Sequence, residues 1–338
     1  MKINTFDLLK DNNLVQVKIN DFFKWHIQDK IKEKFGSLNK YNTQKLKIYF
    51  ITLKKEFYFN KYFKFSRLLD ITKDLNISKE ETYANISTFI AHGTNTRKEI
   101  FLQRKLNIDE FFVEGYALYL AEGDNGSNGK TTPRKVRLTN SELPVIKQFM
   151  AWIQKYFPNN EFYLKIHTPQ HKELSKEFIE QIRTYLSLNK SQIKIRKEEF
   201  RRNTGTFFRL CLDSAVLIDL LLAMEKPIKN LILQDEKLMR AYIRGMMIGE
   251  GTAYCNKIKY VRIEMRNEQE IKFLKELFNH LDFDVKAKER GTRKDIWYIY
   301  VGTLLLKKYN ELIGFGIHNK RQKLLEKAIA EMEKKIKK

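Results

Sequence analysis

The sequence predicts an α+β protein in which two similar αββαββα units pack through a pair of central helices, preceded by a mainly helical N-terminal domain. Two observations support this fold class. A motif occurs twice, consisting of an apolar helical run with two small residues four positions apart, then an acid, then a glycine. The same order of predicted helices and strands follows each copy. We therefore expect a chain with internal pseudo-twofold symmetry.

The two copies of the motif span residues 113–123 and 242–251. Their small residues lie on one face of each helix, because positions i and i+4 are neighbours. These small pairs are Ala117 with Ala121 and Gly245 with Gly249. Small side chains let two backbones approach closely, so we expect the helices to pack through these faces. Glu122 and Glu250 would then lie side by side at one end of the contact.

The elements are clearer in the second unit, which we place at 231–338. There we expect helices over 236–249, 267–281 and 303–312, strands over 252–256, 260–265, 285–290 and 295–301, and a last helix over 320–338. The first unit, 106–230, repeats this order. Its expected helices cover 108–121, 141–156 and 213–224, and its core strands cover 135–139, 193–200 and 206–212. Because the first unit is longer, we place an insertion near 161–190, at the edge of the fold.

Residues 1–105 are expected to form a separate, mainly helical domain. The segment 65–90 has the apolar spacing of a helix-turn-helix motif, with a break at 76–78 where Ser78 can cap a new helix. A plain pair of helices fits the same spacing equally well. Either arrangement would supply a basic helical domain able to contact DNA.

The charge balance points to a polyanionic partner. The chain has 64 Lys and Arg against 41 Asp and Glu, a net charge of +23, and residues 1–105 contribute 21 basic and 11 acidic side chains. An excess of this size favours nucleic acid as the partner. The only cysteines are Cys211 and Cys255, so we expect no disulfide framework and no thiolate zinc site. No apolar run reaches the ~18 residues of a membrane span, and we expect a cytoplasmic, nucleoid-associated protein without a membrane partner.

The paired motifs resemble those of the LAGLIDADG homing endonucleases, in the single-chain form that carries both motifs and in its archaeal and intein-associated type. The 128-residue spacing between Glu122 and Glu250 suits that form. Segments 101–108 and 309–315 are similar to family sequences near the motifs, and the resemblance covers roughly residues 100–330. It implies a monomer with central motif helices and with the sheet of each unit lying over the major groove of double-stranded DNA.

Two features of the motifs depart from the family pattern. The acid often found at the sixth motif position is replaced by Leu120 and Ile248, and Ala117 stands where glycine is usual. Neither position is expected to touch a metal. The acid next to the closing glycine is kept in both copies.

The resemblance implies a site-specific double-strand DNA endonuclease, of the kind used in intron homing, that hydrolyses phosphodiester bonds with Mg²⁺ at two adjacent active sites. The two motif acids would bind the metal together with Gly123 and Gly251, since hard oxygen ligands favour Mg²⁺. By position, Lys320 resembles the active-site lysine of the family in the second unit, and Lys229 or Lys226 that of the first. The alternative is a DNA-binding transcriptional regulator or an RNA maturase that uses the fold without cleavage. The two retained acids favour the enzyme.

Two late hairpins and the strands before them are expected to contact the DNA. Alternate residues share one face of a strand, and a row of cations on such a face can read base edges in a groove ~12 Å wide, with Arg favouring guanine. The predicted DNA-binding residues of the first unit are Arg134, Lys135, Arg137, Lys194, Arg196, Arg201, Arg202 and Arg209. Those of the second unit are Arg262, Lys286, Lys288, Arg290 and Arg293.

Overall fold

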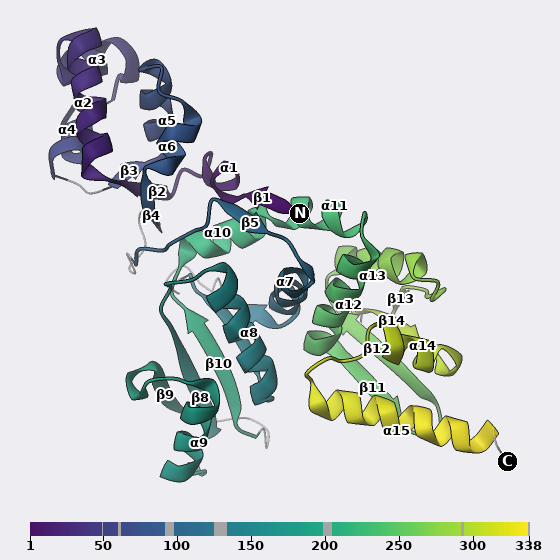
Figure 1. Cartoon of the computed structure of the whole chain (residues 1–338). Coiled ribbons are helices and arrows are strands. Elements are labelled where there is room, and N and C mark those ends of the chain that lie inside the picture. The colour runs from purple at the N-terminus through teal and green to yellow at the C-terminus, as the bar shows by residue number, and fades with distance from the viewer. Residues whose placement is uncertain are drawn as a thin grey trace.

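Two α/β units and an N-terminal domain make up the computed structural model of this protein, which describes residues 1–48, 50–59, 62–91, 98–124, 134–198, 205–291 and 294–336. The central helices of the two units, α7 (Glu110–Glu122) and α12 (Glu236–Glu250), lie side by side (Figure 1). The predicted α+β fold with two pseudo-symmetric units is thus confirmed. None of the helices in the described ranges is long and apolar enough to cross a membrane.

The second unit has the predicted αββαββα order. After α12 come β11 (Gly251–Cys255), β12 (Lys259–Met265), α13 (Glu268–His280), β13 (Lys288–Glu289), β14 (Trp297–Val301), a short turn η4 (Thr303–Leu305) and α14 (Leu306–Leu312). The strands form an antiparallel sheet in the order β11-β12-β14-β13. Val261 and Ile263 are buried under the helices, whereas the alternate residues Arg262 and Glu264 are only partly buried. A last helix, α15 (Asn319–Ile336), packs along β11.

The first unit follows the same plan with an addition. After α7 come β6 (Gly123–Asp124), β7 (Val136–Asn140), α8 (Leu143–Tyr156), β8 (Phe162–Pro169), α9 (Lys176–Leu186), η3 (Lys190–Gln192), β9 (Ile193–Glu198), β10 (Phe207–Leu212), α10 (Ala215–Ala223) and α11 (Glu225–Ile232). The strand order is β6-β7-β10-β8-β9.

This strand order corrects the expected insertion near 161–190. β8 has the place beside the last strand that β13 has in the second sheet, so residues 162–169 belong to the core and the added elements are α9 and β9. β9, at the start of the segment 193–200 that was expected as a core strand, is a fifth strand at the edge. The physical reason is that β8 pairs antiparallel with β10 and buries Leu164 and Ile166. β9 pairs in parallel with β8, which requires a crossover such as α9.

The N-terminal domain contains a sheet that the sequence analysis did not predict. Its elements are β2 (Val15–Ile19), α2 (Asp21–Phe35), α3 (Leu38–Tyr41), η1 (Asn42–Leu46), α4 (Phe50–Lys54), η2 (Lys55–Phe59), β3 (Tyr62–Lys64), α5 (Phe65–Asp74), α6 (Lys79–Ala84) and β4 (Ile86–Ala91). The strand order is β3-β2-β4. The central strand alternates strictly, with Val15, Val17 and Ile19 buried, as a half-buried strand requires.

The predicted break between two helices is present at 76–78. Asn76 takes a left-handed backbone conformation (φ +56°), and the Ser78 hydroxyl accepts a hydrogen bond from the backbone NH of Glu81 at 3.1 Å. The second helix, α6, has only six residues. Ile86 and Phe89, expected on the helical pair, lie instead in β4, because their backbone pairs with β2.

The first residues of the chain belong with the first unit. β1 (Lys2–Asn4) pairs with β5 (Lys105–Asn107), and the Thr5 hydroxyl donates to the Gln103 carbonyl oxygen at 2.6 Å. α1 (Thr5–Leu9) packs against α10. Phe6 of α1 also packs against Phe65, Tyr83 and Phe89, so the first residues join the first unit to the N-terminal domain, whose other elements lie within residues 15–91.

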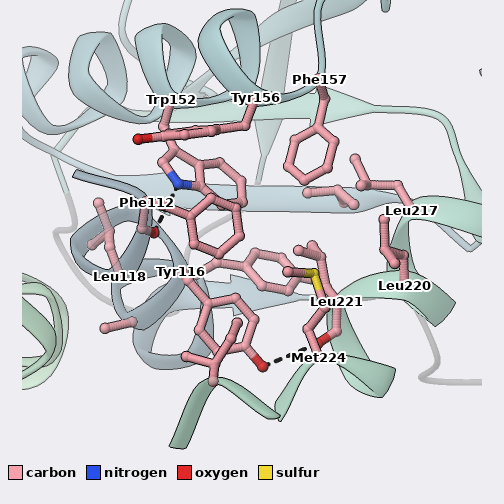
Figure 2. Packing of buried hydrophobic residues seen from close by; sticks show 14 of the residues in the cluster. Phe112, Tyr116, Leu118, Trp152, Tyr156, Phe157, Leu217, Leu220, Leu221 and Met224 are labelled. Carbon is pink, nitrogen blue, oxygen red and sulfur yellow. Dashed lines mark hydrogen bonds between the residues drawn. The ribbon is translucent and has the colours of Figure 1, made fainter. Parts of the chain in front are cut away.

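Aromatic packing holds α7 in place (Figure 2). The indole NH of Trp152, on α8, donates to the Phe112 carbonyl oxygen at 2.9 Å, and the Tyr116 hydroxyl donates to the Leu221 carbonyl oxygen at 3.0 Å. A Cβ at Gly115 would lie 2.2 Å from the Trp152 ring, so only glycine lets α8 pack this closely. The position of the motif helix, and so of its terminal acid, is set by this core.

Candidate functional site

The two motif helices meet through their small residues, as the sequence predicted. A Cβ added at Gly245 would lie 2.3 Å from the Glu114 carbonyl oxygen, and one at Gly249 would lie 2.4 Å from the Ala121 Cβ. Real Cβ atoms do not approach so closely, so glycine at both positions lets the α12 backbone touch α7. The two helices consequently end together.

Glu122 and Glu250 lie at this shared end. The Cβ position of Gly249 is 3.0 Å from the Cγ of Glu122, which places the Glu122 side chain against the last turn of α12. Burial and the nearby charge of Glu250 raise the pKa of Glu122 to about 7. Partial burial also raises the pKa of Glu250, although its side chain reaches solvent. The pair therefore favours a proton or a cation at this site.

Arg321, on α15, supplies the positive charge near both acids. Its Nη1 donates to the carbonyl oxygens of Met247, Ile248 and Gly249 at 3.1, 2.5 and 2.7 Å, which are in the last turn of α12. A cation at a helix C-terminus is stabilising, and the Arg321 charge lowers the pKa of both glutamates against the effect of burial. Sequence reasoning missed this residue, because the choice between neighbours on α15 depends on the orientation of that helix.

One of the two predicted lysines, Lys229, is held away from the acids, and the catalytic role of Lys320 stays a prediction. Lys320 is exposed beside Arg321. Lys229 pairs with Glu225 and Glu270, at 2.8 Å from each. The Tyr242 hydroxyl also donates to Glu270 at 2.6 Å. Tyr242 lies eight residues before Glu250, about 12 Å along the helix, so this ion pair is remote from the site. Lys229 stabilises the contact between α11, α12 and α13.

The site can supply carboxylate oxygens but not a complete metal cage. Among the described residues, no group of three or more His, Cys, Asp or Glu is placed to hold a metal ion. Two carboxylates match the partial protein coordination that Mg²⁺ takes, which is completed by water and phosphate. Gly123 and Gly251 lead directly from helix into extended backbone (ψ 153° and 156°). Their expected role as carbonyl ligands remains a prediction.

Several predicted cations gather on the open face of the first sheet. Arg209 lies opposite Thr139 and Lys165 in the ladder, and its Nε donates to the Thr139 hydroxyl at 2.9 Å. Arg137 lies on the same face of β7, two positions from Thr139. Lys165 was missed because the sequence analysis placed β8 outside the core.

The other predicted cations of the first unit divide into three groups. Lys194 and Arg196 are exposed on β9. Arg134 pairs with Asp219, and Lys135 pairs with Asp213 at 2.8 Å, so both are held by acids of the protein. Arg201 and Arg202 lie outside the described residues.

The open face of the second sheet contains tyrosines that the sequence analysis did not select. They are Tyr254 on β11, Tyr260 on β12, and Tyr298 and Tyr300 on β14. Among the predicted cations, Arg262 and Arg290 both pair with Glu264, at 3.1 and 3.2 Å. Lys286 and Lys288 are exposed, and Arg293 lies outside the described residues. The i, i+2 spacing of Tyr298 and Tyr300 was a usable signal for a shared strand face.

Comparison with known proteins identifies the second unit. Residues 237–314, which run from α12 to just after α14, match the family model described as a LAGLIDADG-like domain. No curated protein matches the chain in sequence. The solved structure of I-DmoI in complex with DNA and Mn is 14% identical, with a TM-score of 0.39, and the match covers 62% of this chain and 98% of that one.

Two further solved structures show a similar level of likeness. The homing endonuclease I-WcaI bound to its DNA recognition sequence is 10% identical with a TM-score of 0.38, and the N-terminal LAGLIDADG domain of DUF199/WhiA is 10% identical with a TM-score of 0.34. Each match covers 61% of this chain and 82% of the other. The family model confirms the predicted resemblance over residues 237–314, where the chain is similar to a LAGLIDADG-like domain.

Proposed function

We propose that this protein is a site-specific double-strand DNA endonuclease with two adjacent active sites that use Mg²⁺. The observation that carries the proposal is the meeting of Glu122 and Glu250 at the end of the paired motif helices. Each glutamate comes from one of two pseudo-symmetric units, which suits a duplex with two antiparallel strands. The LAGLIDADG-like domain and the net charge of +23 support the same function.

The chemistry of the two carboxyls fits a divalent metal. Burial raises the pKa of both carboxyls, and the charge of Glu250 adds to the effect at Glu122, so a bound cation would stabilise the ionised forms. Mg²⁺ bound there would supply an activated water and stabilise the leaving 3′ oxygen in phosphodiester hydrolysis. The protein's own part is to hold the two carboxyls at the helix ends, which Arg321 does by binding the last carbonyls of α12.

The sheets would position the duplex, with the open face of each unit over one half of the target. In Figure 1 the two sheets lie on either side of the central helices, as this arrangement requires. We assign DNA contact to the cations and polar side chains of these faces.

The N-terminal domain is proposed to lengthen the DNA contact, on the evidence of its basic composition. Its α6 does not support a recognition-helix role. Lys79 of α6 pairs with Asp7, Glu80 with Arg104, and Glu81 with His26 at 3.9 Å, so the charges of this short helix contact other parts of the protein. This pairing weighs against a transcriptional regulator built on a helix-turn-helix.

Cleavage of a randomised plasmid library tests the proposed function. The full chain is incubated with the library in Mg²⁺, and the ends produced are sequenced. We expect double-strand breaks at one recurring sequence. Breaks that need no divalent metal, or that fall at random, would contradict the proposal. If no breaks form, while a preferred sequence is still bound in Ca²⁺, the protein is a DNA-binding regulator rather than an enzyme.

A further inference from the structure

The registers of the two sheets can be matched position by position. Gly123 lies opposite Leu138, and Gly251, its counterpart after the second motif acid, lies opposite Ile263. The last strands of the two sheets, β10 and β14, align in the same way, because Leu210 lies opposite Leu138 and Ile299 lies opposite Ile263. The matched positions on the open faces are Arg137 with Arg262, Thr139 with Glu264, Arg209 with Tyr298, Cys211 with Tyr300, and Lys165 with Lys288.

The matched positions differ in chemistry. Arg209 of the first sheet is replaced by Tyr298 in the second, and the buried Cys211 by the exposed Tyr300. A neutral threonine is replaced by Glu264. The two open faces are therefore unequal in charge, although the backbone that carries them is repeated.

In the first sheet, one tyrosine is surrounded by lysines. The ammonium nitrogens of Lys194, Lys135 and Lys165 lie 4.3, 5.6 and 5.9 Å from the centre of the Tyr163 ring. Arg209 and the exposed Arg196 add to this positive surface. The repulsion among these cations is evident in Lys165, whose pKa is lowered by burial and by the charges of Arg196, Lys135 and Arg209. Asp213 holds Lys135 at 2.8 Å, and the remaining cations, Lys194, Lys165, Arg196 and Arg209, form a surface that suits the phosphates of a duplex.

In the second sheet, one arginine is surrounded by tyrosines. The Arg262 guanidinium carbon lies 5.0, 5.8 and 5.8 Å from the ring centres of Tyr254, Tyr260 and Tyr298. Its Nη2 donates to the Tyr254 hydroxyl at 2.7 Å and pairs with Glu264 at 3.1 Å. Arg262 is thus held in one orientation before any ligand arrives, and the rings around it form an apolar surface that continues to Tyr300, which is 43% exposed.

We propose that the two sheets read their halves of the target by different chemistry. The first sheet binds mainly through backbone phosphates. The second reads a thymine-rich half through contacts of its tyrosine rings with the 5-methyl groups, and reads one guanine through Arg262. This inference rests on the proposed function.

Physical chemistry connects these surfaces to the two kinds of base contact. The thymine methyl is the apolar group that the major groove offers, and a fixed guanidinium fork matches the O6 and N7 acceptors of guanine. Phosphate contacts release counterions and make affinity fall with salt, whereas apolar contacts do not. The first half of the target should therefore carry most of the salt dependence.

The test begins with selection of a duplex by the full chain in Ca²⁺, followed by binding measurements over a range of salt. We expect Lys194→Gln and Lys165→Gln each to reduce the log-log salt slope by about 0.9. Tyr300→Ala should weaken binding by a similar factor at every salt concentration and leave the slope unchanged. Lys272→Gln, on the outer surface of α13, is the matched control and should change neither property.

Modified duplexes test the base contacts with the unaltered protein. Uracil in place of thymine should weaken binding by about fourfold for each methyl contacted, and only in one half of the target. In that half, 7-deazaguanine at a single position should cost roughly 10- to 100-fold. Arg262→Lys should abolish this second loss, because lysine lacks the fork that recognises N7. Repeating the selection with Arg137→Lys and with Arg262→Lys assigns each half to its sheet.

The outcomes separate this inference from the function on which it rests. If the full chain enriches no duplex, both are overturned. If it enriches a duplex whose two halves lose equal affinity on uracil substitution, or if Tyr300→Ala changes the salt slope as Lys194→Gln does, the inference alone is overturned.

Discussion

Gly249 and Ala121 touch where the two motif helices end: a Cβ on Gly249 would lie 2.4 Å from that of Ala121 and 3.0 Å from the Glu122 Cγ. The same contact therefore sets the separation of the helices and the placement of an acid. Any substitution that pushes the helices apart should affect both stability and activity.

We expect Gly249→Ala to destabilise the protein, although alanine normally favours a helix interior by roughly 0.5–1 kcal/mol over glycine. The added methyl group has no room, and overpacking of this kind costs about 1–3 kcal/mol. Thermal melting measures the effect. Gly291→Ala is the matched control, since a Cβ at Gly291 meets nothing within 4 Å. A Gly249→Ala protein that melts at or above the parent temperature would show that the helices can separate freely.

Glu122→Gln and Glu250→Gln should each abolish double-strand cleavage while DNA affinity in Ca²⁺ falls only slightly. Each substitution removes charge that would bind metal but leaves the sheet contacts intact. Nicking of one strand should persist in either variant.

A gel-shift assay run beside a cleavage assay in Mg²⁺ separates the two effects. The matched control is Glu236→Gln, at the opposite, exposed end of α12, which pairs only with Arg240 in the same helix. If both site variants still cut both strands fully, Glu122 and Glu250 are not catalytic.

Arg321→Gln should destabilise the metal-free protein by roughly 1.5–3 kcal/mol, the usual scale for hydrogen bonds from a charged group. It removes three bonds to the end of α12 and the charge that offsets the two glutamates. Divalent metal should therefore raise the melting temperature of this variant more than that of the parent. Lys320→Gln is the control, because Lys320 is exposed and makes none of these contacts. Equal behaviour of the two variants would contradict the role given to Arg321.

Protonation of His318 should cost stability on acidification, against the gain that protonation of Glu122, whose pKa is raised to about 7, gives over the same pH range. Burial and the charges of Arg321 and Lys320 lower the pKa of this imidazole from 6.5 to about 4. Between these values the imidazole is protonated in the unfolded chain but not in the folded protein. The contribution of His318 to the free energy of unfolding is therefore complete above pH 6.5 and is lost as the pH falls towards 4.

Urea unfolding at several pH values measures this loss, which we expect to be at most about 3 kcal/mol. His318→Gln should remove this loss, so that the free energy of unfolding at pH 4, relative to that at pH 6.5, is higher in the variant than in the parent. His280→Gln, on the exposed surface of α13, should leave it as in the parent. If both variants keep the parent slope, other groups carry the acid sensitivity.

Removal of the N-terminal domain should succeed only if the first residues of the chain are kept. A fragment that starts at residue 96 loses β1 and the Thr5 bond to Gln103, and should unfold at a lower temperature than the parent. Val15 lies opposite Ala91 in the sheet, so a short Gly-Ser linker can replace residues 15–91.

That internal deletion should melt closer to the parent than the fragment does, and should bind DNA with a smaller salt slope if the domain contacts phosphates. If the salt slope, the affinity and the footprint on DNA are all unchanged, the N-terminal domain does not bind DNA.

Local sequence patterns were enough to predict the motif helices, their small faces and the pair Glu122 and Glu250. These features depend on residues within one or two helical turns of each other, where spacing alone decides which side chains share a face. The break at Ser78 is local in the same way, because a cap is made between a side chain and a backbone NH three residues later.

Only the tertiary structure decided that β8 rather than β9 is the core strand, that Arg321 binds the end of α12 beside the acids, and that tyrosines surround Arg262. β-pairing and helix docking join residues far apart in the chain, and the sequence near each residue does not record its partner. A one-residue change in strand register or in the orientation of α15 would reverse which side chains face the site. The identity of the two acids was therefore readable from the sequence, whereas the charges and rings around them became visible only when long-range packing fixed every face.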